Sequence, residues 1–218
     1  MPRNTFEVQL RALKNQMLEL GLEADRTIAD SVNALQTRDR VLAEALVAHD
    51  VEINRTRYEI EQGCYTLIAT QQPLASDLRE IISILLIAIE LERIADHSKN
   101  IAEIVVRTDE ELLLKPLAYL PRMSERAQEM LKQVLDAFAR NDAALALVVI
   151  RMDDQVDHLY KQVFQDVMMH GVQDPPAATR ALNLLFAAHN IERIADRVTN
   201  IGERVIYAAT GQLEELNI

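Results

Sequence analysis

Residues 91–106 read LERIADHSKNIAEIVV, and residues 191–206 read IERIADRVTNIGERVI. Nine of these sixteen positions are identical when the chain is shifted by 100 residues. A shorter match links Asp50-Val-Glu-Ile-Asn54 with Asp153-Asp-Gln-Val-Asp157, and each of these two segments precedes a turn that contains proline. Self-similarity at a fixed spacing is typical of a structural unit that is used more than once. We therefore expect the chain to contain one unit twice.

Helical periodicity extends through nearly the whole chain. Apolar residues recur every three or four positions, as in the run from Leu10 to Leu35, and no segment alternates as a strand would. With 5 Gly and 6 Pro among 218 residues, helix breaks are sparse and the helices must be long. Six helices are predicted, at residues 5–36, 39–71, 74–108, 117–140, 142–171 and 176–210. The predicted fold class is all-α, with two pseudo-symmetric three-helix bundles at residues 1–109 and 110–218.

The composition excludes several classes of protein. An apolar fraction of 49% is too high for a disordered chain, and the single Cys64 excludes a disulfide framework and a thiolate zinc cluster. The net charge of −11 would repel a phosphate backbone, so nucleic-acid binding is not expected. The longest apolar run, Ile81–Ile89, is well short of the roughly 18 residues needed to cross a membrane. We expect a cytoplasmic protein without direct membrane insertion.

The repeated motif carries a strip of oxygen-bearing side chains. At about 100° per residue, Glu92, Asp96, Asn100 and Glu103 fall within about 80° of one another on one helix face, apart from the apolar stripe. The same strip recurs in the second copy as Glu192, Asp196, Asn200 and Glu203. Carboxylates four residues apart repel each other, so a solvated helix usually alternates its charges instead. The duplicated strip therefore indicates a cation site, although surface charge on an amphipathic helix stays an alternative.

The preceding helix of each unit supplies a matching pair at the same spacing, Asp50 with Asn54 and Asp153 with Asp157. Two adjacent helices would then bring several oxygen donors to one point, as in the carboxylate clusters of helical bundles. Hard oxygen donors favour Mg²⁺, Mn²⁺, Ca²⁺ or iron, and zinc is a weaker candidate without thiolates. The candidate metal ligands are Asp50, Glu92, Asp96, Asn100, Glu103, Asp153, Asp157, Glu192, Asp196, Asn200 and Glu203.

At these residues the sequence resembles the PhoU family. The resemblance rests on the doubled Glu-Arg-Ile-x-Asp…Asn-Ile-x-Glu strip, on Gln-Gln-Pro-Leu-Ala-Ser-Asp-Leu-Arg at 71–79, and on the length of the chain. It implies two three-helix bundles whose Glu/Asp-x-x-x-Asp motifs can hold multinuclear metal clusters, and the oxygen donors favour iron, Mn or Mg over Zn in them. The corresponding pairs here are Glu92 with Asp96, Glu192 with Asp196, and Asp153 with Asp157. Asp50 and Asn54 match less well, because Asn54 is an amide where an acid is expected.

The resemblance also implies a function. Members of the family restrain phosphate uptake and repress the phosphate-starvation response, through contacts with the ATPase subunit of a phosphate ABC transporter and with a sensor histidine kinase. It implies a non-enzymatic regulator, a homodimer or higher homo-oligomer, and a peripheral membrane location reached through partners. Two alternatives stay open: a metal-free helical adaptor, and a carboxylate-bridged metalloenzyme. The enzyme is disfavoured because such enzymes need Glu-x-x-His pairs, and no acid–histidine pair recurs in both copies.

Overall fold

The computed structural model describes residues 3–108, 118–171 and 175–212, and helices account for nearly all of them. The prediction of an all-α fold is confirmed. The helices of the first repeat are α1 (Arg3–Thr37), α2 (Arg40–Gln71) and α3 (Ala75–Arg107). Those of the second repeat are α5 (Tyr119–Arg140), α6 (Ala143–Ile150), α7 (Asp153–Gly171) and α8 (Pro175–Thr210).

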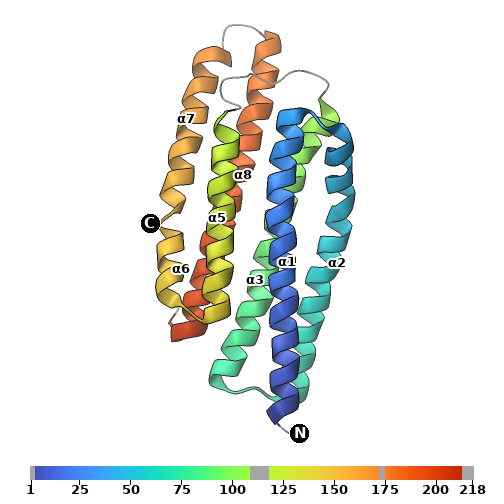
Figure 1. Cartoon of the computed structure of the whole chain (residues 1–218), viewed down its shortest axis with the longest axis vertical. Helices are drawn as coiled ribbons and strands as arrows, with labels where there is room; N and C mark the ends of the chain where they lie inside the picture. The colour runs from blue at the N-terminus through green and yellow to red at the C-terminus, as the bar shows by residue number, and fades with distance from the viewer. Residues whose placement is uncertain (1–2, 109–117, 172–174, 213–218) are drawn as a thin grey trace.

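The two repeats lie side by side as elongated bundles (Figure 1). Helices α1, α2 and α3 all contact one another, while α5, α6 and α7 pack around α8. The bundles are joined by α3 against α8 and by α1 against α5. The prediction of two three-helix bundles therefore agrees with the structure, and the predicted boundary between residues 109 and 110 lies outside the described part of the chain.

The fifth predicted helix, at residues 142–171, is wrong as a single element. It consists of α6 and α7, separated by a turn at Arg151 and Met152 in which the Met152 N–H donates to the Val149 carbonyl at 2.9 Å. Just before the break α6 closely approaches α8, where a Cβ on Gly202 would lie 2.8 Å from Ile150 Cγ1. As a result α7 begins at Asp153, whereas α2 continues unbroken through the corresponding region of the first repeat.

The turn before the second helix is built in the same way in both repeats. Arg38 and Asn141 each adopt a left-handed conformation with φ of 58°. The next residue, Asp39 or Asp142, caps the following helix by accepting a hydrogen bond at 2.9 Å from the backbone N–H three residues later. Aspartate at this position satisfies a donor that the first helical turn would leave unpaired. The duplication thus extends to the local backbone geometry.

The apolar stripes predicted from the sequence form one continuous core. Ile87, Ile94, Ile101 and Val105 are buried in the first repeat, and Ile194 and its neighbours are buried in the second. The oxygen-bearing strip of each repeat is only half-buried, between the core and the surface. None of the described helices is long and apolar enough to cross a membrane.

Helices α3 and α8 meet in an antiparallel seam with approximate two-fold symmetry. His97 Nδ1 of α3 lies 3.1 Å from Asn190 Oδ1 of α8, and Arg197 Nη1 of α8 lies 3.5 Å from Glu90 Oε2 of α3. A shift of 100 residues converts the positions of one pair into those of the other. The approximate two-fold symmetry of the seam therefore relates the acidic strip of α3 to the acidic strip of α8.

Candidate metal centre

In the second repeat, four carboxylates come from two neighbouring helices. Asp153 and Asp157 lie in the first two turns of α7, and Glu192 and Asp196 lie one turn apart on α8. All four side chains are half-buried. Because α7 packs along α8, the two acidic pairs face each other across the interface. The structure therefore places the four acids on two packed helices, and their role as metal ligands stays a prediction.

The charges of this second-repeat cluster interact strongly. Burial, together with the negative charges of Asp196, Asp157 and Glu192, raises the pKa of Asp153 from 3.8 to about 7. Burial also raises the pKa of Glu192, with additional repulsion from Asp196. An acid whose pKa is raised by burial and like charge is stabilised by a proton or by a bound cation.

Arginine, lysine and histidine side chains lie at the margin of the cluster, and the lysine, Lys161, has its Nζ 3.8 Å from Asp157 Oδ2. Arg193 Nη1 is 2.6 Å from Asp196 Oδ2, as expected for an arginine one turn from an acid. His189 Nδ1 is 3.2 Å from Glu192 Oε2, and the centroid of its ring lies 6.1 Å from that of Tyr160, with the two rings tilted by 45°. The His189 contact does not have hydrogen-bond geometry, since Glu192 Oε2 is buried without a hydrogen-bond partner. Each of these groups approaches a single acid.

The second-repeat cluster has the chemistry of a hard-cation site. Asp153 Oδ1 and Glu192 Oε2 are buried oxygens that lack hydrogen bonds, and they belong to different helices. Such oxygens gain from coordination to Mg²⁺, Mn²⁺ or iron. In the described residues, however, no three His, Cys, Asp or Glu side chains already share one point at metal-binding geometry. Metal binding here would therefore require side-chain rotation.

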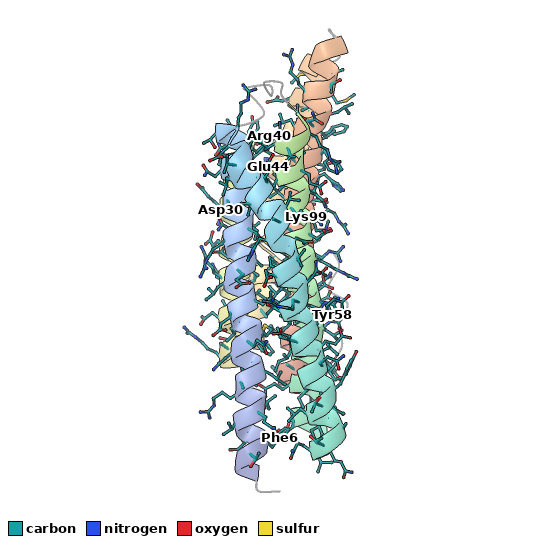
Figure 2. The ribbon with its side chains drawn as sticks, turned by 90° about the vertical axis from the view of Figure 1, so that its right-hand side faces the viewer. Phe6, Asp30, Arg40, Glu44, Tyr58 and Lys99 are labelled. Carbon is teal, nitrogen blue, oxygen red and sulfur yellow. The ribbon has the colours of Figure 1, made fainter. Side chains whose placement is uncertain are left out.

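The acidic strip of the first repeat has a different arrangement. Asp50 of α2 and Asp96 of α3 both bind Lys99, whose Nζ lies 3.1 Å from Asp50 Oδ2 and 3.2 Å from Asp96 Oδ1. Asn54 Nδ2 also donates to Asp50 Oδ2, at 3.0 Å. Figure 2 labels Lys99 on the side of the molecule where α2 and α3 run next to each other. An ammonium group therefore occupies the position between the two helices.

Glu92, the third acid of the first repeat, lies near a second cation. Burial raises the pKa of Glu92, while the positive charge of Arg57 on α2 opposes that rise. Arg57 is itself mostly buried, pairs with Glu61 and stacks 3.8 Å from the ring of Tyr58. The first repeat thus brings together the predicted Asp50, Glu92 and Asp96 with two lysine or arginine charges.

The other predicted ligands lie apart from these clusters. Glu103 pairs with Arg107 on its own helix, and Asn200 Nδ2 donates across the seam to Glu90 Oε2 at 3.4 Å. Asn100 and Glu203 are half-buried further along the same strips. Angular position on one helix does not fix the side chain's partner, because the strip spans the interfaces with two different neighbouring helices.

Sequence reasoning missed Arg57 and Tyr160. They occupy corresponding positions on α2 and α7, each one turn after the acidic or amide pair of its repeat. The signal was present in the alignment of the two copies: position 57 is a cation and position 160 is neutral, just as Lys99 corresponds to Thr199. Comparing the two copies for their differences would have found both.

Comparisons with known proteins agree with this architecture. A PhoU domain matches twice, at residues 17–105 and 120–205. The chain is 37% identical over 208 residues to the phosphate-specific transport system accessory protein PhoU homolog of Pseudomonas aeruginosa, covering 94% of this chain and 86% of the relative. It is 36% identical over 209 residues to the homolog from Rhizobium meliloti, covering 95% and 88%.

Solved structures extend the similarity to three dimensions. The crystal structure of PhoU from Pseudomonas aeruginosa superposes with a TM-score of 0.90 at 36% identity, covering 95% of this chain and all of that one. The phosphate transport system regulatory protein PhoU from Streptococcus pneumoniae gives 0.89 at 31% identity, covering 97% and 100%.

The fold places this protein in the class of all-helical proteins that consist of two three-helix bundles in tandem, here with one acidic cluster in each bundle. The relatives are named as accessory or regulatory proteins rather than as enzymes. The chain belongs to the PhoU domain family.

Proposed function

We propose that the protein is an accessory protein of a phosphate-specific transport system that restrains phosphate uptake and represses the phosphate-starvation response. The observation that carries this proposal is the end-to-end match of both repeats to relatives with that name, at 34% identity over the full length of the homolog from Clostridium acetobutylicum. In this role the chain acts by contact, on the ATPase subunit of the transporter and on a sensor histidine kinase. A homodimer in the cytoplasm, held at the membrane by these partners, is part of the proposal.

We further propose that the second-repeat cluster (Asp153, Asp157, Glu192 and Asp196) binds a divalent or iron cation. The support is the pair of buried carboxylate oxygens without hydrogen bonds and the mutual repulsion of the four acids. The cation would neutralise this charge and tie α7 to α8, so its role is structural. Iron, Mn²⁺ and Mg²⁺ suit the all-oxygen donor set better than Zn²⁺.

The regulatory role is tested by deletion of the gene in its own host, with phosphatase expression measured in high phosphate. We expect derepression in the deletion strain and repression after complementation with the unmodified gene. Repression that persists without the gene would contradict the regulatory role.

The metal role is tested separately by complementation with D153N/D196N, after confirming that the variant accumulates normally. We expect incomplete repression, with D154N as the matched control because Asp154 is exposed on the same helix. Full repression by D153N/D196N would instead favour the metal-free adaptor, a candidate consistent with the lack of a preformed metal geometry among the described residues.

A further inference from the structure

The two acidic clusters occupy corresponding positions but carry unequal charge. On the second helix of each repeat, Asp50 and Asn54 correspond to Asp153 and Asp157. On the third helix, Glu92 and Asp96 correspond to Glu192 and Asp196. The first repeat therefore offers three carboxylates, and the second repeat offers four.

At two corresponding positions the first repeat has a cation where the second repeat has an uncharged residue. Lys99 corresponds to Thr199, and Arg57 corresponds to Tyr160. The Thr199 hydroxyl donates to the Asp196 carbonyl of its own helix at 2.7 Å, so it contributes no charge to the cluster. The two substitutions lie on different helices, and both remove a positive charge at their own positions. Lys161, which corresponds to Tyr58, restores one ammonium group to the second repeat, but it is 70% exposed and lies 3.8 Å from Asp157 alone.

The position of Lys99 is that of a bridging cation. Its Nζ contacts one carboxylate oxygen from α2 and one from α3, and its side chain is 24% exposed while that of Asp50 is 13% exposed. A metal ion bound by the same two oxygens would lie within a few ångströms of this ammonium group. Like charges at that separation repel strongly in a partly buried site, so the ammonium and a metal ion exclude each other.

We propose that Lys99, supported by Arg57, is a covalently attached substitute for a metal ion, so that the first repeat is cation-independent and only the second repeat takes up metal. The second half of this statement rests on the proposed metal role of the second-repeat cluster. The first half stands on the Lys99 contacts alone. The two homologous sites thus differ in kind, one closed by a side chain and one dependent on an ion from solution.

The test is a titration of the full-length chain with Mn²⁺. Binding is measured by electron paramagnetic resonance, as the decrease in the signal of free Mn²⁺. We expect the unmodified protein to bind Mn²⁺, D153N/D157N to lose this binding, and D50N to retain it. The double variant K99T/N54D gives the first repeat the four acids of the second repeat and removes the bridging ammonium group, while Arg57 stays in place. We expect it to bind at least one additional Mn²⁺ per chain.

The reciprocal variant T199K places the ammonium in the second repeat, and we expect it to lower Mn²⁺ affinity at least tenfold. Because Thr199 is buried, Y160R at the half-buried position 160 tests the same effect if T199K fails to fold, as judged by circular dichroism.

Three results would overturn the proposal: loss of Mn²⁺ binding in D50N, no gain in K99T/N54D, or unchanged affinity in a folded T199K or Y160R. If the unmodified chain binds no Mn²⁺ but K99T/N54D does, the role of Lys99 is supported and the proposed metal role of the second repeat fails.

Discussion

The environment of Asp153 leads to a prediction about stability that can be tested on the protein without metal. Its half-buried carboxylate lies near three other acids, and its pKa is raised from 3.8 to about 7. The folded state therefore holds a proton on Asp153 at pH values where the unfolded chain has lost it. By linkage, the contribution of Asp153 to the free energy of unfolding falls as the pH rises from about 4 to about 7, and stays low above that range.

The Asp153→Asn variant keeps the shape of the protonated acid and removes this pH dependence. A pKa difference of about 3 units corresponds to at most about 4 kcal/mol, at 1.36 kcal/mol per unit. Since Asp153 is partly exposed, solvent screening reduces the expected gain to about 2 kcal/mol at pH 8. For a chain of this length, the gain corresponds to a rise of about 4–8 °C in Tm.

The assay is urea unfolding at pH 5 and pH 8 in the presence of a chelator, followed by circular dichroism. We expect the free energy of unfolding of D153N to be higher than that of the unmodified protein at pH 8. At pH 5 we expect this difference to be smaller. The exposed neighbour Asp154 supplies the control variant D154N, which should change stability little at either pH. An advantage of D153N that is absent at pH 8, or equal at the two pH values, would refute the raised pKa of Asp153 and its origin in burial and repulsion.

Three further predictions concern the scaffold. Asp142→Ala removes the cap of α6 and should lower the free energy of unfolding by about 1 kcal/mol, whereas D142N should retain most of it; equal losses in urea titrations would argue against capping. Ile94→Ala should cost about 2–5 kcal/mol and Ile94→Val about 1, because Ile94 is fully buried; a smaller loss for Ala than for Val would contradict the core assignment. Burial lowers the pKa of His97 below 6.5, so His97 favours the folded state above that pH and this contribution is lost as the pH falls. The unfolding free energy of H97Q relative to the unmodified protein should therefore improve between pH 7.5 and pH 5.5, and a constant difference would contradict the shift.

The repeated motif was sufficient to predict the fold because it records both the helical period and the duplication. Residues such as Ile94 and Ile194 are buried at corresponding positions, and the six predicted helices agree with the structure except at Arg151 and Met152. That break had no sequence signal, since neither residue is Gly or Pro. The break lies next to Ile150, which packs closely against Gly202 of a helix distant in the sequence, and such a contact cannot be read from one segment.

The candidate site was predictable in its acids but not in its counter-charges. Spacing placed Glu192 and Asp196 on one face, and packing brought Asp153 opposite them. The spacing of residues along the sequence does not determine whether the Lys99 side chain points to solvent or inward. A lysine has several rotamers, and the one that Lys99 adopts depends on Asp50, a residue of another helix. Side-chain direction between helices is a tertiary property, and the sequence of one helix does not determine it.

The seam between α3 and α8 has the geometry of a two-fold dimer contact within a single polypeptide. In a dimer of identical subunits, the two positions that are related by the axis must carry the same residue. Here Glu90 meets Arg197 as an ion pair while Asn190 meets His97, so the two halves of the seam carry different chemistry. Covalent linkage of the halves thus frees each one to specialise while their mutual orientation and their one-to-one ratio stay fixed.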